Sequence, residues 1–373
     1  MTTTSTPTAA VPREFSIHLD LLRFGAAFMV MLFHIKLEKL GPENILRFIP
    51  SHGHTFVILF FVLSGYVIAA TADRKKDSGL REFLLDRMAR VYSVAVPVLV
   101  VCSLFALFLS TTFDPQRLWT SGTDQIYTTL GLNLLFLGQS WHLQMTPFTN
   151  NPYWSLCYEV MYYALFAGFV FLRGIPRILT VSLAALLAGP KVLLLLPCWL
   201  LGVAAYHWRD RWRLGRTTAV LVAFILPVLI LIALNQIGFS PAVRAFTKAW
   251  FGAAYEGLYF SNDFLIDYAA ASLVAIHLYA ARYIGLRWPD RISTAIKAGA
   301  AMSFTLYLFQ GPLVMVVSTA LGPRHGEWTA FVVAAVGIPI VCYGIAGITE
   351  SRRGAVRRWL DQWLPGGRQR ALV

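Results

Sequence analysis

The sequence predicts an all-α fold, a polytopic transmembrane helical bundle with about ten spans. Of its 373 residues, 57% are hydrophobic and only 14% are charged, which is about half the charged share of a typical soluble protein. The mean hydropathy is +0.59. The apolar residues gather in blocks close to the ~20 residues that cross a hydrocarbon core as a helix. An ordinary cytosolic enzyme is therefore excluded.

These blocks divide the chain into three regions. We expect a polar N-terminal tail at 1–14 with no removable signal peptide, a transmembrane domain at 15–349, and a basic cytoplasmic tail at 350–373 that lies on anionic lipid. The expected spans are 15–36, 54–72, 92–112, 153–172, 178–189, 191–207, 217–236, 263–282, 298–320 and 327–348.

Two stretches leave alternatives open. Residues 124–140 are apolar but short, and the segment either crosses the membrane or forms an interfacial or re-entrant helix. Residues 176–207 are broken by Gly189, Pro190 and Pro197, so they form one long kinked helix or two short helices.

The distribution of positive charge favours the second model. The chain carries 32 Lys and Arg against 19 Asp and Glu, a net charge of +13. In a soluble protein this excess would suggest nucleic acid, but in a membrane protein Lys and Arg accumulate in cytoplasmic loops. A single span over 176–207 would place the basic loop at 209–216 outside. We therefore expect ten spans, both termini in the cytoplasm, and no nucleic-acid partner.

The cysteines do not indicate a disulfide or a metal site. Each lies alone in an apolar segment without CxxC spacing, which favours buried, small hydrophobic side chains. They are Cys102, Cys157, Cys198 and Cys342.

Three ionisable residues lie inside the first expected span. Charges within a span cost a few kcal/mol on insertion scales, so each is a functional candidate. Asp20, Arg23 and His34 project from one helix face, with Arg23 and His34 about 16 Å apart along the axis. The alternative is that Asp20 and Arg23 neutralise each other at i, i+3 and that His34 simply lies at the interface.

Arg87 and Arg90 stand just before the third expected span, at i, i+3. Both guanidinium groups can therefore meet one ligand at the inner surface, and arginine forks suit phosphate. The competing interpretation is positive-inside topology alone.

Glu159 lies about one and a half turns into an otherwise apolar, aromatic helix, where a carboxylate must be paired or protonated. Its expected depth is comparable with that of His34, so a His34–Glu159 pair or a purely structural ion pair would satisfy it. Tyr307 and Gln310 add polar groups to the ninth span, where helix-packing hydrogen bonds are the simpler interpretation.

Four motifs together resemble those of the acyltransferase-3 family, which comprises multi-pass bacterial membrane acyltransferases acting on cell-surface sugars and some secondary metabolites. The resemblance is strong over the first 170 residues and returns near the end. The matching residues are Asp20, Arg23 and His34; Phe60 to Tyr66, including Ser64; Arg87, Arg90 and Tyr92; and Trp154, Ser155, Leu156, Glu159, Tyr162 and Tyr163.

This chain differs from the family's late motif. Ser303, Tyr307 and Pro312 match it, but Gln310 replaces the usual histidine. The family's Glu-x-Pro after the last span is reduced to Glu350 followed by Ser351 and Arg352. The role that the missing histidine has in relatives therefore does not carry over to this chain.

The resemblance implies an O-acyltransferase with cytoplasmic acyl-CoA, usually acetyl-CoA, as co-substrate and no bound cofactor. The acceptor it implies is a saccharide hydroxyl on an exopolysaccharide, lipopolysaccharide or lipid-linked precursor, with a macrolide-type secondary metabolite as the alternative. It also implies a multi-pass protein of the bacterial plasma (inner) membrane. A homo-oligomer is left open.

Within this framework the residues take the following expected roles. His34 removes the acceptor proton and Glu159 orients its ring; alternatively, His34 or Tyr307 carries the acyl group covalently. Arg23 stabilises the developing oxyanion and Asp20 orients Arg23. Arg87 and Arg90 bind the acyl-CoA phosphates. Tyr307, Ser64 and Trp154 support the site, and no metal is expected.

Two other classes of function fit the intramembrane charges. A transporter or flippase of a glycolipid or sugar would line its path with Asp20, Arg23 and Glu159, although the sequence shows no paired repeats. A membrane scaffold for polysaccharide assembly would make His34 dispensable.

Overall fold

The computed structural model describes residues 11–75, 79–109, 125–148 and 150–363. Every regular element in these ranges is a helix, as the sequence predicts. The main helices are α1 (Arg13–Leu37), α2 (Glu43–Leu46), α3 (His54–Arg74), α4 (Gly79–Leu109), α6 (Ile126–Leu134), α7 (Tyr153–Phe171), α8 (Gly174–Ala188), α9 (Pro190–Leu194), α10 (Leu196–His207), α11 (Arg216–Val220), α12 (Leu226–Gln236), α13 (Phe239–Phe251), α14 (Phe264–Ala281), α15 (Asp290–Leu321), α16 (Trp328–Val332), α17 (Ile338–Ile348) and α18 (Arg353–Trp363).

The predicted multi-pass architecture is confirmed. Nine helical stretches of the described chain are long and apolar enough to cross a membrane. The expected span at 178–189 corresponds to α8, which has 15 residues and reaches only about 22 Å at 1.5 Å per residue. The interrupted stretch at 176–207 forms two separate segments, α8 and the α9–α10 unit, because Gly189 adopts φ 77° and ends α8. The two-helix alternative was therefore the right one.

The doubtful stretch at 124–140 contains only the nine-residue helix α6. At 1.5 Å per residue this helix is about 14 Å long and cannot cross a core of about 30 Å. Its Thr129 and Asn133 are buried, whereas Tyr127 is 87% exposed. As far as the described residues extend, a short helix at the side of the bundle replaces a span.

Helix α4 begins well before its expected membrane segment, at Gly79 instead of about residue 92. The early part is amphipathic and buries its apolar side chains. The ring of Phe83, for example, lies 6.1 Å from that of Phe166 and 5.2 Å from that of Phe171 on α7. Because this packing extends the helix, Arg87 and Arg90 lie within α4 and not in a preceding loop.

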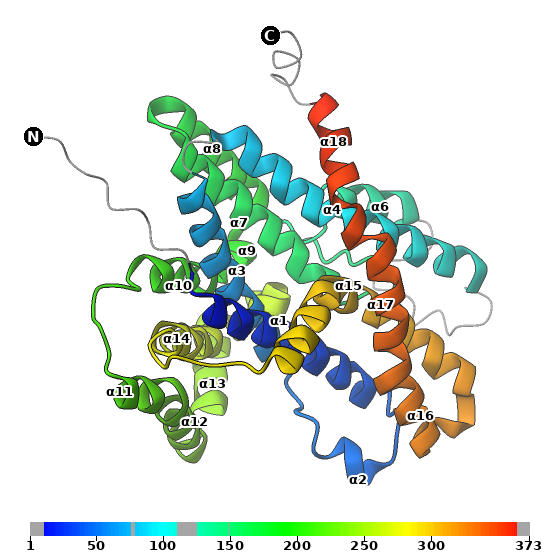
Figure 1. Ribbon diagram of the computed structural model, residues 1–373. Coiled ribbons are helices and arrows are strands. Elements are labelled where there is room, and N and C mark those ends of the chain that lie inside the picture. Colours follow the sequence, from blue (N-terminus) through cyan, green and yellow to red (C-terminus); the bar gives the residue numbers. More distant parts are fainter. Residues whose placement is uncertain (1–10, 76–78, 110–124, 149, 364–373) are drawn as a thin grey trace, which may run out of the picture.

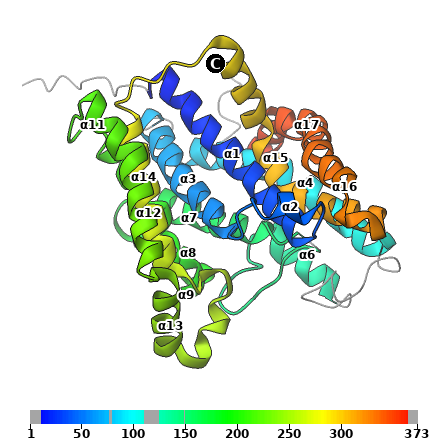
Figure 2. The ribbon, with the colours of Figure 1, turned by 90° about the horizontal axis from the view of Figure 1, so that it is seen from below.

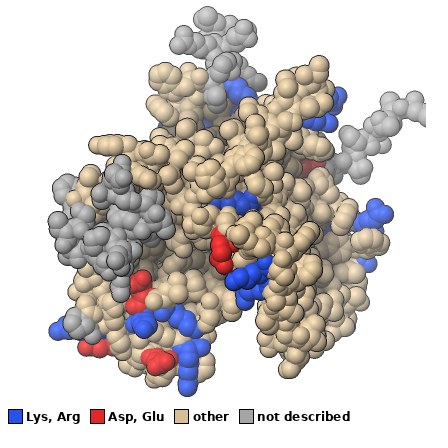
Figure 3. All heavy atoms as spheres, turned by 180° about the vertical axis from the view of Figure 1, so that it is seen from behind, with Lys and Arg blue, Asp and Glu red and all other residues tan. Residues whose placement is uncertain are grey.

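Helices α1, α3 and α15 form the middle of the bundle. Helix α1 packs on both α15 and α3, and α3 packs on α10. Helices α11 and α12 lie to one side of this centre and α16 and α17 to the other (Figures 1 and 2). The face seen in Figure 3 is mostly uncharged, and its Lys, Arg, Asp and Glu side chains gather at a few places. This distribution suits a surface that contacts lipid.

Helices α3 and α10 meet without intervening side chains. A Cβ atom at Gly65 would lie 2.0 Å from the Trp199 carbonyl oxygen, and one at Gly202 would lie 1.9 Å from that of Val62. Only glycine permits such an approach of two backbones, as at other membrane helix crossings. The crossing fixes the position of Ser64, the neighbour of Gly65.

Two prolines in the helices release carbonyl groups that side chains then bond. Pro312 in α15 has no N–H for the carbonyl of Leu308, which accepts a 2.9 Å hydrogen bond from Asn150 Nδ2 instead. Pro227 in α12 similarly leaves the carbonyl of Ala223, which lies 2.9 Å from His277 Nδ1. These side chains satisfy backbone groups that have no water to bond within a membrane.

The basic C-terminal segment packs against α4 over its described part. Arg357 of α18 pairs with Glu82 and, at 3.0 Å, with Asp86, while Arg81 of α4 pairs with Asp361. The acidic residues of α4 thus neutralise part of the basic charge that we expected to lie on anionic lipid. Two tryptophans, Trp359 and Trp363, remain exposed on this helix.

Candidate active site

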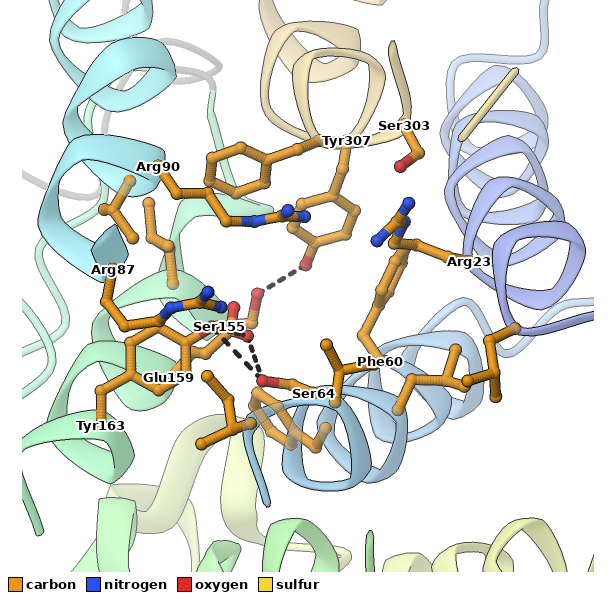
Figure 4. Close-up of a pocket in the computed structure, with 18 of the residues that line it drawn as sticks. Arg23, Phe60, Ser64, Arg87, Arg90, Ser155, Glu159, Tyr163, Ser303 and Tyr307 are labelled. Atoms are coloured by element: carbon orange, nitrogen blue, oxygen red, sulfur yellow. Dashed lines mark hydrogen bonds between the residues drawn. The ribbon is translucent and has the colours of Figure 1, made fainter. Parts of the chain in front are cut away.

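A cavity of about 250 Å³ lies between α1, α3, α4, α7 and α15 (Figure 4). Its walls are mainly apolar, with a few polar and charged groups facing inward. Such a combination is typical of a small-molecule site. The charged and hydroxyl residues that line it are Ser16, Asp20, Arg23, Ser64, Arg87, Arg90, Ser155, Glu159, Tyr163, Ser303 and Tyr307. Most of the predicted site residues therefore meet in one place.

Asp20 and Arg23 form an ion pair in the wall contributed by α1. Arg23 Nη2 donates a 2.8 Å hydrogen bond to Asp20 Oδ1, as their i, i+3 spacing predicts. Arg23 Nε has no hydrogen-bond partner among the described residues. The electrostatic neighbours of Arg23 also include Arg90 and Glu350, so the pair is part of a larger charged group.

Arg87 and Arg90 bring two further positive charges to the cavity from α4. Arg87 is only 8% exposed, and Arg90 lies with its guanidinium carbon 5.9 Å from the centroid of the Phe304 ring. No described residue accepts a hydrogen bond from either guanidinium group. Because a buried charge without a partner is costly, the two arginines favour an anionic ligand.

Glu159 is held from two sides in the same cavity. The Ser64 hydroxyl donates to Glu159 Oε1, and the Tyr163 hydroxyl donates to the same oxygen over 2.5 Å. Trp199 Nε1 in turn donates to Ser64 Oγ over 3.2 Å. Two hydroxyl donors on one oxygen fix the position of this carboxyl group, which lines the same cavity as Arg87 and Arg90.

His34 does not line this cavity and does not contact Glu159. Its Nδ1 lies 2.9 Å from the carbonyl oxygen of Val30, one turn earlier on α1. A carbonyl only accepts, so Nδ1 carries the proton, and the Nε2 of a neutral ring keeps its lone pair. The pair expected from equal depth is not formed: Glu159 binds Ser64 and Tyr163 instead.

Gln310 occupies the position next to His34 where the family usually has a histidine. Its side chain approaches the His34 ring and is fully buried. Neither its amide nitrogen nor its oxygen has a hydrogen-bond partner of good geometry in the described part of the chain. A buried amide without a hydrogen bond of good geometry is uncommon in proteins.

Tyr307 connects the cavity with the Gln310 region along α15. Its hydroxyl lies 2.7 Å from Ser155 Oγ and donates over 3.2 Å to the Pro152 carbonyl. Gln310 follows Tyr307 by three residues, which places it about one turn further along the same helix. The cavity and His34 are therefore linked by a single turn of α15.

Trp154 supports the structure from outside the cavity. Its ring stacks on Phe260, with centroids 4.4 Å apart, and on His54, with centroids 5.5 Å apart. His54 Nε2 also lies 3.0 Å from Asp267 Oδ2. The sequence gives no sign of this His54–Asp267 pair, because the two residues are far apart in the chain and belong to no motif.

Two other residues that form hydrogen bonds near the site were not predicted from the sequence. Tyr163 was noted only as a match to a motif, although its i, i+4 spacing from Glu159 indicates a shared helix face. Asn150 precedes α7. Its role becomes clear only when Pro312 is known to leave the Leu308 carbonyl without an N–H donor, because Asn150 Nδ2 then donates to that carbonyl. All four cysteines are buried and free, as expected. The described residues contain no group of three or more His, Cys, Asp or Glu that could hold a metal ion.

The chain is similar to several known proteins. A family model described as an acyltransferase domain, Acyl_transf_3, matches residues 17–347. The chain is 38% identical over 90 residues to an O-acetyl transferase of Shigella phage Sf6, covering 24% of this chain and 25% of that protein. It is 29% identical over 175 residues to the exopolysaccharide production protein ExoZ of Rhizobium meliloti, covering 43% and 47%.

A third relative, protein 2 in the picA locus of Rhizobium radiobacter, is 31% identical over 167 residues, which is 42% of this chain and 83% of that protein. The chain thus spans a quarter to a half of the length of the first two relatives. No solved structure matches it.

Proposed function

The chain belongs to the acyltransferase-3 family, and from this premise we propose that it is a membrane O-acyltransferase. The donor is cytoplasmic acyl-CoA, with acetyl as the transferred group, and the acceptor is a hydroxyl of an exopolysaccharide, a lipopolysaccharide or a lipid-linked precursor. The names of the relatives, an O-acetyl transferase and an exopolysaccharide production protein, support this choice.

The observation that carries the proposal is the unpaired charge of Arg87 and Arg90 beside an apolar cavity. The donor has phosphates at one end and a thioester at the other, so it needs cations at the mouth of its site and an uncharged channel for its arm. Arginine forks bind phosphate oxygens in pairs. Arg23, held by Asp20, adds a third positive charge to the same cavity.

In this proposal His34 is the base that takes the proton of the acceptor hydroxyl. The hydrogen bond of Nδ1 to Val30 leaves Nε2 as the basic nitrogen. The hydroxyl oxygen then attacks the thioester carbon, the C–S bond breaks, and the thiolate of coenzyme A takes up a proton. A covalent relay through His34 or Tyr307 is the alternative route for the same transfer.

The proposed location is the bacterial plasma membrane with both termini in the cytoplasm. Support comes from the excess of Lys and Arg in the segments that this orientation places inside. The orientation also places the early part of α4, with Arg87 and Arg90, toward the compartment that supplies acyl-CoA.

The test follows the acyl group in membrane vesicles prepared from cells that express the protein. With radiolabelled acetyl-CoA, we expect label to enter the saccharide fraction and to be released by mild alkali, as an ester would be. His34→Ala should lower this transfer by at least about 100-fold, because general base catalysis contributes about 10² to 10⁴. His52→Ala, an exposed histidine, should leave it unchanged. Transfer at the normal rate by folded His34→Ala protein would refute the role of His34.

A further inference from the structure

A second cavity, of about 460 Å³, adjoins the first between α4, α15, α17 and the segment that leads into α18. Arg90 lines both cavities. The polar residues that complete the second one are Ser93, Tyr343, Glu350, Ser351 and Arg353. One arginine therefore stands at the boundary of two adjacent spaces.

The second cavity carries unused positive charge. With the described residues, Arg353 makes only a long hydrogen bond, from Nη2 over 3.3 Å to the backbone oxygen of Asp86. It also lies close enough to Arg90 for their like charges to interact. Glu350 is the one carboxylate in the lining. Its Oε1 already accepts from Thr305 N at 3.0 Å and Thr305 Oγ1 at 2.8 Å.

The C-terminal helix holds Arg353 in this place. Arg357 pairs with both Glu82 and Asp86, and Asp86 also pairs with Lys75. The acidic groups of α4 thus form their ion pairs with other cations. Asp86 is an electrostatic neighbour of Arg353, but no carboxylate of the described residues forms an ion pair with Arg353. Two neighbouring guanidinium groups in a concave, half-buried setting form a site for a dianion such as phosphate.

We propose that this second cavity binds a phosphate group, held by Arg90 and Arg353, and that the phosphate belongs to the acyl donor. The inference rests on the proposed function, and it assigns the phosphate-bearing end of acyl-CoA to the second cavity and its thioester arm to the first. An anionic lipid headgroup presents the same phosphate chemistry, and the experiment below distinguishes these two sources.

The experiment compares two donors with purified protein in bilayer nanodiscs. One is acetyl-CoA and the other is S-acetylpantetheine, which has the same thioester arm but no phosphate. Arg353→Gln should raise the KM for acetyl-CoA about tenfold, in line with the loss of a charged hydrogen bond, with kcat little changed. The KM for S-acetylpantetheine should not change. Arg353→Lys, which keeps the charge, should recover part of the loss.

Neighbouring exposed arginines on the same segment provide matched controls. Arg352→Gln and Arg358→Gln remove the same charge from the surface and should leave both donors unaffected. An equal effect of all three variants would overturn the assignment, because it would reflect the general charge of the tail. Equal CoA binding by Arg353→Gln and the unmodified protein would overturn it as well.

Two further outcomes separate the inference from its premise. Nanodiscs of phosphatidylcholine alone and with phosphatidylglycerol should give the same Arg353 effect. If Arg353→Gln changes only how strongly phosphatidylglycerol competes with acetyl-CoA, the bound phosphate belongs to lipid. That result would overturn the assignment to the donor. If the unmodified protein neither binds CoA nor transfers acetyl, the proposed function itself fails. If the unmodified protein binds CoA and transfers acetyl but Arg353→Gln does not raise the KM for acetyl-CoA, only the assignment of phosphate to the second cavity fails.

Discussion

At the scale of single residues, the chain concentrates its polar chemistry on a few side chains. The sequence predicted Asp20, Arg23 and Glu159 as site residues because charge inside an apolar span needs a reason. It predicted Arg87 and Arg90 because two arginines at i, i+3 can bind one phosphate. All five line one cavity. Apart from the Asp20–Arg23 ion pair, the sequence could not predict their partners. Depth along a helix axis follows from the residue number, but the direction in which a side chain faces a neighbouring helix depends on packing, so the expected His34–Glu159 pair was wrong.

Glu159 provides a test at this scale. Glu159→Gln keeps the shape and one acceptor but removes the carboxyl group that lines the cavity with Arg87, so we expect a folded protein with acyl transfer lowered at least about tenfold. Glu159→Leu also removes the acceptor of the Ser64 and Tyr163 hydroxyls and should cost about 1–3 kcal/mol of stability. Transfer rates and thermal unfolding in nanodiscs give the two readouts.

The control for both variants is Glu256→Gln, since Glu256 is exposed and pairs with Lys248 only at 3.7 Å. Glu256→Gln should change neither the transfer rate nor the thermal unfolding. Full activity of Glu159→Gln would assign this carboxylate to helix packing.

At the scale of helices, the sequence predicted which segments are helical, but it did not predict where each helix begins and ends. The apolar blocks located the spans because hydropathy reports what lipid tolerates. Helix α4 nevertheless starts at Gly79, since an amphipathic turn continues a helix wherever its apolar face finds a partner. The α3–α10 crossing was also invisible in the sequence: Gly65 and Gly202 lie far apart, and nothing local distinguishes them from other glycines.

This crossing supplies a prediction. A methyl group at Gly202 would lie 1.9 Å from the Val62 carbonyl oxygen, so Gly202→Ala must push α3 and α10 apart. We expect about 1–3 kcal/mol of destabilisation and a loss of acyl transfer, because the same helices carry the Trp199–Ser64 hydrogen bond. Thermal unfolding of Gly344→Ala, where a Cβ meets nothing within 4 Å, is the comparison. Equal thermal-unfolding midpoints for Gly202→Ala and Gly344→Ala would contradict the close packing of α3 against α10.

At the scale of the whole molecule, the orientation in the membrane is testable with thiol chemistry. All four native cysteines are buried and free, so they should react little with a membrane-impermeant maleimide. With both termini in the cytoplasm, Lys39→Cys should label in intact cells, and Arg211→Cys should label only after the membrane is opened. Both native side chains are exposed in the structure. The reverse pattern would invert the bundle and place the second cavity on the side without acyl-CoA.

The outermost helix has a practical consequence. No residue of α12 is buried, so this helix has little protein to rest on, and annular lipid is its main neighbour. Micelles that strip this lipid would loosen α12 from α14, whose His277 lies against the carbonyl of Ala223 in the turn before it. Purification that preserves a native belt of lipid is therefore the condition under which rates and affinities of this protein are meaningful.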